Sequence, residues 1–220
     1  MADHHRTEAF QRLKLSKIHL TPRLLERCPR RVARQFDSLW APVEEFAQRL
    51  HPLPTALVQF LTHTPRGHIV LTAGVSSYEV GAQSLRRQEL EAVAFISLTD
   101  LVEEPLHALH VVGHLLDHLL GCQGAPQGGW LSDGHALSPP WVEIGQQVPE
   151  LFELGYAIDQ IAAANPRQYF AQSLAWYIQN RRRLNVADPL IERLLRQTLF
   201  SENFCRRTLL SSQKYVSQHN

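Results

Sequence analysis

The sequence lacks the features that mark several large classes of protein. Its 22 lysine and arginine residues are balanced by 21 aspartate and glutamate residues, a formal net charge of +1, whereas a nucleic-acid-binding domain usually carries a clear basic excess. No apolar run approaches the roughly 20 residues that cross a bilayer. The start of the chain, MADHHRTEAF, also lacks the apolar segment of a secretory signal. We therefore expect a protein that binds neither nucleic acid nor membrane.

Cysteine is scarce, and its positions are far apart. The three cysteines are Cys28, Cys122 and Cys205, with no C-x-x-C pair. Their odd number and wide spacing argue against a disulfide-stabilised fold and against a thiolate zinc site, and are typical of a reducing compartment. Hydrophobic residues make up 44% of the chain and charged residues 20%, an ordinary balance for a folded domain. We expect a globular, cytoplasmic protein.

Hydrophobic spacing and turn residues predict a mostly helical chain with a small sheet. We expect a helical N-terminal region over 1–50 and a main domain over 51–220, and the lack of a clear linker leaves open one continuous domain. The expected strands are 57–63, 68–75 and 92–98. A helix is expected from Thr99 or Asp100 to about Leu120, ending at Gly121, and a long loop over 121–140. Further helices are expected over 147–163, 166–180 and 187–199.

Histidine is the residue that the sequence has in excess, with 12 copies. Four of them, His107, His110, His114 and His118, follow one another at spacings of three, four and four residues. On a helix they share an arc of roughly 80°. Two imidazoles one turn apart can bind a single zinc ion. The alternative, most plausible for His107 and His118, is that the rings are hydrogen-bonded core residues.

Two segments resemble one enzyme family. The segment HVVGHLLDHLLG is similar to the zinc-binding helix of the zincin metallopeptidases, usually HExGHxLDxxxG, and closest to the branch that includes the catalytic domain of anthrax lethal factor and its bacterial relatives. Further along, NPRQYFAQSLAWYIQN resembles the helix of that branch that reads like PxEFFAEAFAxY, in which the glutamate of FAE is the third zinc ligand. The resemblance covers roughly residues 85–190. It implies an α+β, mostly helical zincin-like domain with a small sheet beside the histidine helix, and zinc on His110 and His114.

The chain departs from the family at three chemical positions. In HExxH the glutamate is the general base that activates metal-bound water, and Val111 takes its place. Gln172 stands at the position of the third ligand, where a neutral amide is a poor zinc ligand. A tyrosine that many relatives carry two turns earlier corresponds to Asn165. We therefore expect no catalytic residue at position 111, and zinc that binds weakly or not at all.

Several other side chains near these motifs are candidates for supporting roles. The resemblance gives Asp117 a second-shell role, orienting an imidazole. Alternative ligands are His107, His118 and a carboxylate of the segment after the loop, with Glu143 foremost and Glu150 and Glu153 beside it. The loop sequence Ser132–His135 suggests a catalytic triad, but Asp and Gly at its centre favour a turn.

Three functions remain open from the sequence. The first, which we favour, is a degenerate zincin-like protein that has lost peptidase activity and retains metal or protein binding, with an unidentified protein or peptide as partner. The second is an active zinc-dependent hydrolase whose base has moved to a carboxylate within 143–153. The third is an interaction module without metal, which binds a partner through residues 1–50.

Overall fold

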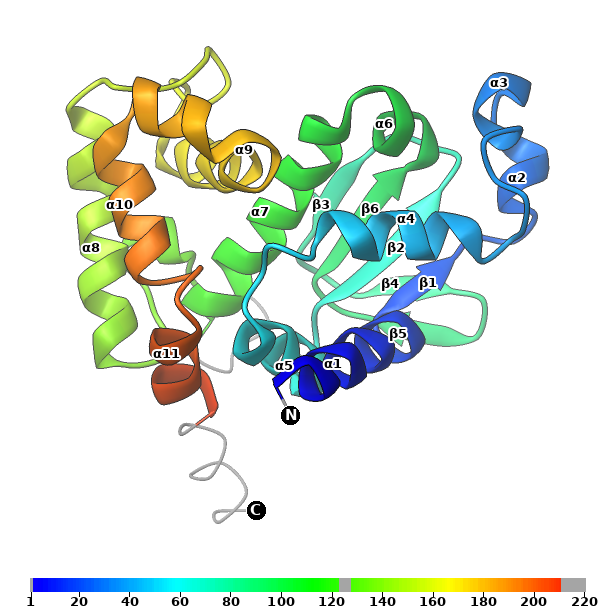
Figure 1. Cartoon of the computed structure of the whole chain (residues 1–220), viewed down its shortest axis with the longest axis horizontal. Helices are drawn as coiled ribbons and strands as arrows, with labels where there is room; N and C mark the ends of the chain where they lie inside the picture. Colours follow the sequence, from blue (N-terminus) through cyan, green and yellow to red (C-terminus); the bar gives the residue numbers. More distant parts are fainter. Residues whose placement is uncertain (1, 123–127, 211–220) are drawn as a thin grey trace.

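A mixed sheet of four strands lies at the centre of one half of the computed structural model, which describes residues 2–122 and 128–210 (Figure 1). The strands follow the order β1-β2-β6-β3, in which β1, β2 and β6 are parallel and β3 is antiparallel to β6. Together with the hairpin β4–β5, the strands are β1 (Ile18–Leu20), β2 (His68–Thr72), β3 (Ser77–Glu79), β4 (Gln83–Leu85), β5 (Gln88–Leu90) and β6 (Val93–Ser97). The expected α+β class is confirmed, because helices make up most of the remaining structure.

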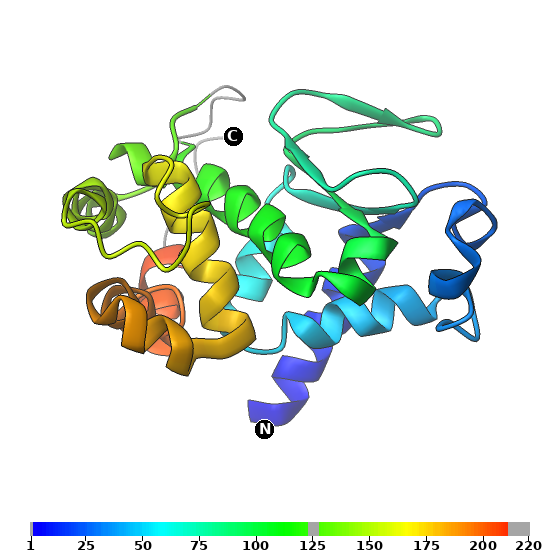
Figure 2. The ribbon, with the colours of Figure 1, turned by 90° about the horizontal axis from the view of Figure 1, so that it is seen from above.

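Side chains alternate between the two faces of the sheet. Ile69 and Leu71 of β2 belong to the main core, whereas Val70 between them packs in a small second cluster with Val93 of β6 and Leu90 of β5. This alternation follows from the two-residue period of a strand. The hairpin β4–β5 therefore covers the face of the sheet that the helices leave open, and Figure 2 shows it extending from the sheet.

Helices surround the sheet and build the other half of the molecule. The helix α7 lies between the sheet and the group α8–α11 (Figure 1). The helical segments are α1 (Ala2–Ser16), α2 (Leu24–Arg27), α3 (Arg30–Ala33), α4 (Ala41–Arg49), α5 (Thr55–His63), α6 (Leu98–Glu103), α7 (Pro105–Gly121), α8 (Pro139–Glu153), α9 (Pro166–Ala187), α10 (Pro189–Gln197) and α11 (Glu202–Cys205), with a 3-10 turn at Leu131–Asp133 and a π-helical turn at Arg206–Leu210.

The N-terminal region is helical except for one strand that the sequence analysis missed. Ile18–Leu20 pairs with β2, and three residues are too few to show a strand period. Side chains of this region, such as Leu13 and Phe46, are buried in the same core cluster as Leu195 near the other end of the chain. Residues 1–50 thus contribute to the core of the main domain.

The expected strand over 57–63 is wrong, since these residues form α5. The helix buries Ala56, Leu57, Val58, Phe60 and Leu61 and packs against α1. A short apolar run fits a buried helix as well as a buried strand, so spacing alone could not decide between them. The expected strands at 68–75 and 92–98 are confirmed in β2 and β6, with β2 shorter than predicted.

The single helix expected from Thr99 to Leu120 is two helices. Glu104 adopts a non-helical conformation, with φ −132° and ψ 61°, directly before Pro105, because the proline ring excludes the helical conformation from the residue that precedes it. The cap of α6 is Ser97, whose hydroxyl accepts a hydrogen bond from the Thr99 amide at 3.2 Å. The predicted end of α7 at Gly121 is confirmed.

The helices after the loop have other boundaries than expected. The helix α8 begins at Pro139 rather than 147, because prolines fit a first turn where no N–H partner is needed. It ends at Glu153 instead of continuing to 163, and Gly155 follows with a positive φ of 74°. The helix α9 continues to Ala187 across a break at Asn180, whose φ is −157°. Of the expected loop 121–140, residues 123–127 lie outside the described residues.

The helices α7 and α9 approach each other most closely at Gly113. A Cβ atom on Gly113 would lie 2.6 Å from both the Cα and the carbonyl oxygen of Ala171. Such a distance is shorter than van der Waals contact, so only glycine fits at this crossing. Because His110 and His114 flank Gly113 on α7, and Gln172 follows Ala171 on α9, the crossing sets the separation of these candidate ligands.

We predict that Gly113→Ala lowers the free energy of unfolding by roughly 1–3 kcal/mol, because the added methyl group forces the two backbones apart. The helix propensity of alanine works in the opposite direction by up to about 1 kcal/mol. Guanidinium denaturation measures the change. Gly81→Ala is the control, since a Cβ there meets nothing within 4 Å. An unchanged midpoint for Gly113→Ala would mean that α7 and α9 separate without cost.

Candidate functional site

The histidine row of α7 divides into three environments. His107 is exposed, and its Nδ1 lies 3.2 Å from a carboxylate oxygen of Asp100. His110 is 7% exposed and His118 is fully buried, while His114 is half-buried. Only His110 and His114 contact each other, so the structure brings together two of the four histidines that the sequence places on one face.

The rings of His110 and His114 meet edge to face. Their Nε2 atoms are 3.0 Å apart, and the ring planes cross at 86°. Both Nδ1 atoms are buried without a hydrogen-bond partner in the described part of the chain. Burial lowers the pKa of His110, an effect that the nearby amides of Gln168 and Gln172 oppose, and burial lowers the pKa of His114 to about 4. Both rings are therefore neutral at pH 7, the state in which imidazole binds metals.

The separation of the two nitrogens suits a shared metal ion. Two nitrogens that are each about 2.0–2.1 Å from a tetrahedral zinc ion lie about 3.3 Å apart. The observed 3.0 Å is a few tenths of an ångström shorter. A direct hydrogen bond between the two rings also fits this distance, but it leaves one Nδ1–H donor buried and unpaired. Unpartnered Nδ1 atoms are therefore expected both with a shared metal ion and with a direct hydrogen bond between the rings.

Gln172 of α9 lies beside the histidine pair. It is 1% exposed, and its amide nitrogen donates a hydrogen bond to Oδ2 of Asp159 at 2.7 Å. The indole of Trp176 donates to the same oxygen at 2.8 Å. Because Asp159 holds the amide nitrogen, the amide oxygen is directed away from Asp159, and it has no hydrogen-bond partner of acceptable geometry within the described residues.

The position of the general base is occupied by a core residue. Val111 is 3% exposed and belongs to the main hydrophobic core. Glu143, Glu150 and Glu153, the expected alternative carboxylates, are all exposed on α8. The structure gives none of them a contact with the histidine pair among its described interactions.

The carboxylate next to the pair is Asp159, which the sequence analysis did not single out. Its negative charge acts to raise the pKa of His110. Burial acts to raise its own pKa, but hydrogen bonds from Ala162, Trp176 and Gln172 outweigh that effect and lower it. The residue stands in the irregular segment between α8 and α9, where no spacing links it to a motif. Its contacts with Gln172 and Trp176, which are one helical turn apart, could not be predicted locally.

Asp117 fixes the loop after α7 instead of an imidazole. The residue is fully buried, and its two carboxylate oxygens accept hydrogen bonds from the backbone amide and the hydroxyl of Ser132, at 2.8 and 2.6 Å. The loop then turns at Gly134, which has a positive φ of 85°. The turn predicted for Ser132–His135 is confirmed by the 3-10 turn there, and the exposed His135 makes no triad with Ser132.

His118 belongs to a separate buried cluster, which it forms with Tyr78 and Cys122. Its Nδ1 lies 2.5 Å from the hydroxyl of Tyr78 on β3, and its Nε2 lies 3.0 Å from Sγ of Cys122. Burial lowers the pKa of His118 to about 4 and raises the pKa of the Cys122 thiol. Both ring nitrogens are thus engaged, so His118 has none left for the site of His110 and His114.

The indole of Trp130 connects the two histidine environments. Its ring centroid is 5.9 Å from that of His114 and 5.2 Å from that of His118. The guanidinium of Arg167 stacks on the same indole at 4.7 Å and pairs with Asp133 at 2.5 Å. The loop is therefore held across α7 by one ion pair and by aromatic packing.

Asn165 stands at the position where the zincins that the sequence resembles often carry a tyrosine. Asn165 caps α9, accepting a hydrogen bond from the Gln168 amide at 3.0 Å. The hydroxyl of Tyr169 donates to Asp188 within the core at 2.5 Å, and Tyr156 is 54% exposed. Of these two tyrosines, which are close to Asn165 in sequence, Tyr169 is therefore held in the core and Tyr156 is exposed.

Comparison with models of known protein families, with curated proteins and with solved structures finds no match for this chain. Among the described residues, no group of three or more histidine, cysteine, aspartate or glutamate side chains is arranged to hold a metal ion. The amides of Gln172, beside His110, and of Gln168, beside both histidines, are the neighbouring side chains that could complete a site at this pair. Within the same residues, no helix is both long and apolar enough to cross a membrane.

We predict that the wild type and Asp117→Asn differ in how their stability depends on pH. Burial raises its pKa from 3.8 to about 7 against the two hydrogen bonds from Ser132, so the folded state binds a proton that the unfolded state has lost. The stability that the protonated Asp117 carboxyl contributes is fully present below pH 3.8 and is lost as the pH rises to about 7. Compared with Asp117→Asn, the free energy of unfolding of the wild type should fall by about 1.4 kcal/mol per pH unit in this range.

Guanidinium denaturation at several pH values between 4 and 7, with a chelator present, measures this difference. The buried histidines act in the opposite direction, since their lowered pKa values destabilise the fold as the pH falls below 6.5. This effect of the histidines is the same in the wild type and in Asp117→Asn, so it cancels in the difference between the two free energies of unfolding. A difference that stays constant over this range would contradict the assignment of a raised pKa to Asp117.

Proposed function

We propose that the protein is a degenerate zincin-like protein, a metallopeptidase fold that has lost its catalytic base and serves in binding. The arrangement of the histidine pair supports this most strongly, with two Nε2 atoms 3.0 Å apart on one helix. The order of elements supports it as well. The strand β6 is followed by the short helix α6 and then by the histidine helix α7, and after a loop and α8 the helix α9 carries Gln172 alongside the pair.

His110, His114 and the amide oxygen of Gln172 are the residues that would hold the metal. Imidazole nitrogens and a carbonyl oxygen are ligands that zinc accepts. The histidines would bind through the two adjacent Nε2 atoms, and the unpartnered amide oxygen of Gln172 fits the third position. All three donors are neutral, so no ligand charge offsets that of a divalent ion. We therefore expect zinc to bind more weakly here than at a site with a glutamate at position 172.

Hydrolysis would require a base that this arrangement does not supply. A zinc ion polarises a carbonyl and lowers the pKa of a bound water, but in HExxH enzymes a glutamate accepts the proton. Val111 has no proton acceptor, and both oxygens of Asp159 already accept hydrogen bonds. Loss of peptidase activity with retained binding of a peptide or protein is therefore the better conclusion. A cytoplasmic location belongs to the same proposal and is supported by three free cysteines.

An active hydrolase remains the second candidate, with Asp159 as its base in place of the glutamates of α8. The observation in its favour is the electrostatic effect of Asp159 on His110. It requires Asp159 to give up its hydrogen bonds to Gln172 and Trp176. Peptidase activity that Asp159→Asn abolishes would support this second function over the first.

We predict that the wild type binds about one zinc per chain in equilibrium dialysis against micromolar zinc, followed by elemental mass spectrometry. His110→Ala/His114→Ala should lose this zinc, because both imidazole ligands are gone. His107→Ala is the matched control and should bind as the wild type does, since His107 is exposed and lies beside Asp100. Equal zinc in the wild type and the double variant would exclude the pair as the site.

We predict that Gln172→Glu on its own gains little zinc affinity. The new carboxylate would stand against Asp159, which now accepts a hydrogen bond from Gln172 at 2.7 Å, and like charges at that distance disfavour ionisation of both. Adding Asp159→Asn removes the repulsion and should tighten zinc binding by about tenfold or more over the wild type. Competition with a chromophoric chelator measures the affinity. A large gain from Gln172→Glu alone would mean that Asp159 does not restrain position 172.

A further inference from the structure

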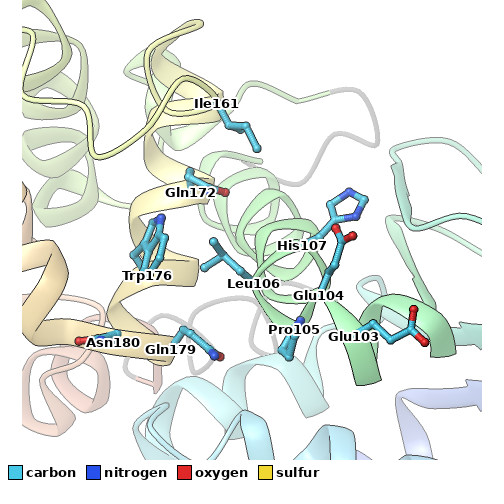
Figure 3. A pocket seen from close by; sticks show the side chains of 10 residues that line it. All are labelled: Glu103, Glu104, Pro105, Leu106, His107, Ile161, Gln172, Trp176, Gln179 and Asn180. Carbon is cyan, nitrogen blue, oxygen red and sulfur yellow. The ribbon is translucent and has the colours of Figure 1, made fainter. Parts of the chain in front are cut away.

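An open cavity of about 680 Å³ lies between the start of α7 and the middle of α9 (Figure 3). Its volume falls within the range of pockets for small ligands. One wall is formed by residues 103–107 at the junction of α6 and α7, and the other by side chains of α9 together with Ile161. Gln172 belongs to its lining, so the cavity adjoins the histidine pair.

The charges around the cavity favour a cation. Glu103 and Glu104 line it, and among its described lining residues there is no lysine or arginine. Glu103 pairs with Arg31 at 2.8 Å, whereas the exposed Glu104 carboxylate has no partner among the described residues. The first helical stretch of α9 ends at Asn180, which also lines the cavity. A helix carries partial negative charge at its C-terminal end.

A buried acceptor in the wall makes no hydrogen bond of acceptable geometry, although the His110 ring lies beside it. The amide oxygen of Gln172 has no hydrogen-bond partner in the described part of the chain, although the residue is only 1% exposed. Figure 3 shows this oxygen turned toward α7, opposite to the nitrogen that Asp159 holds. A buried acceptor without a donor costs free energy, which a ligand with N–H groups would recover.

The remaining walls combine apolar side chains with the polar His107 and Gln179. Leu106 of α7 and Ile161 lie on opposite sides of the cavity, and Trp176 of α9 also belongs to its lining (Figure 3). Ile161 is 50% exposed, which is high for a large apolar side chain. Arg183 stacks on the indole of Trp176 at 4.3 Å, but is not part of the lining. These walls suit the methylene groups of an aliphatic chain.

We infer that this cavity binds a primary ammonium group on an aliphatic chain, the chemistry of a lysine side chain. The ammonium N–H groups would donate to the Gln172 amide oxygen and to the Glu104 carboxylate, and the methylenes would contact Leu106 and Ile161. The inference extends the proposed function by naming the ligand chemistry of the binding protein. It does not require the metal, because the Glu104 carboxylate and the apolar walls are independent of the histidine pair.

Calorimetry and NMR titration with defined probes test the inference, with a chelator present throughout. The probes are N-acetyl-lysine N-methylamide, for a lysine presented by a peptide, and 1,5-diaminopentane, for a free diamine. Glu104→Gln should weaken binding about fivefold, as expected for loss of one solvent-exposed charge contact. Glu143→Gln is the matched control, an exposed glutamate on α8 outside the cavity, and should change nothing.

Acetylation of the ε-amine should abolish binding of the lysine probe, because the charge and two donors are lost. Tighter binding of the lysine amide would identify a peptide as the source of the ammonium, and tighter binding of the diamine a free amine. Either supports the inference. Equal binding of the acetylated probe, or equal affinity of the wild type and Glu104→Gln, would overturn it.

The same titration separates this inference from the metal proposal. His110→Ala/His114→Ala should bind the lysine probe as the wild type does while losing zinc. Ammonium binding by a wild-type protein that does not bind zinc would refute the metal site alone. Zinc binding without any ammonium binding would refute the cavity alone.

Discussion

The contact between α7 and α9 at Gly113 is the constraint on which the candidate site depends. A Cβ on residue 113 would lie 2.6 Å from the backbone of Ala171, so the two helices cross more closely than a side chain at this position permits. On α7, His110 lies three residues before Gly113 and His114 directly after it, and on α9 Gln172 directly follows Ala171. A wider crossing would separate the imidazoles from the amide, whatever their chemistry.

Neighbouring residues hold His110, His114 and Gln172 in place, although the site has neither a base nor an anionic ligand. Asp159 orients Gln172 through one hydrogen bond and Trp176 through another. Asp117 secures the loop whose Trp130 packs on His114. Burial keeps both imidazoles neutral. At the positions where the zincins that the sequence resembles carry a base and an anionic ligand, this chain has a buried valine and an amide. This combination is the reason why we propose a binding role.

The sequence predicted those parts of the structure that depend on local signals. The α7 helix, its end at Gly121 and the strand β6 follow from spacing and stop residues. The break before Pro105 was missed, although its cause is local. The helix α5 was taken for a strand because its apolar run fits both. The role of Asp159 could not be predicted, since it depends on how the segment before α9 folds back onto α9, and no spacing in the sequence records that contact.

X-ray absorption at the zinc edge of the zinc-loaded protein tests the central claim most directly, because it reports the ligands themselves. The account predicts two imidazoles from neighbouring turns of one helix and oxygen donors, with no sulfur in the coordination sphere. Cys122 lies beside His118 and away from the pair. A sulfur ligand at about 2.3 Å, or coordination without imidazole, would contradict the account and place the metal elsewhere in the molecule.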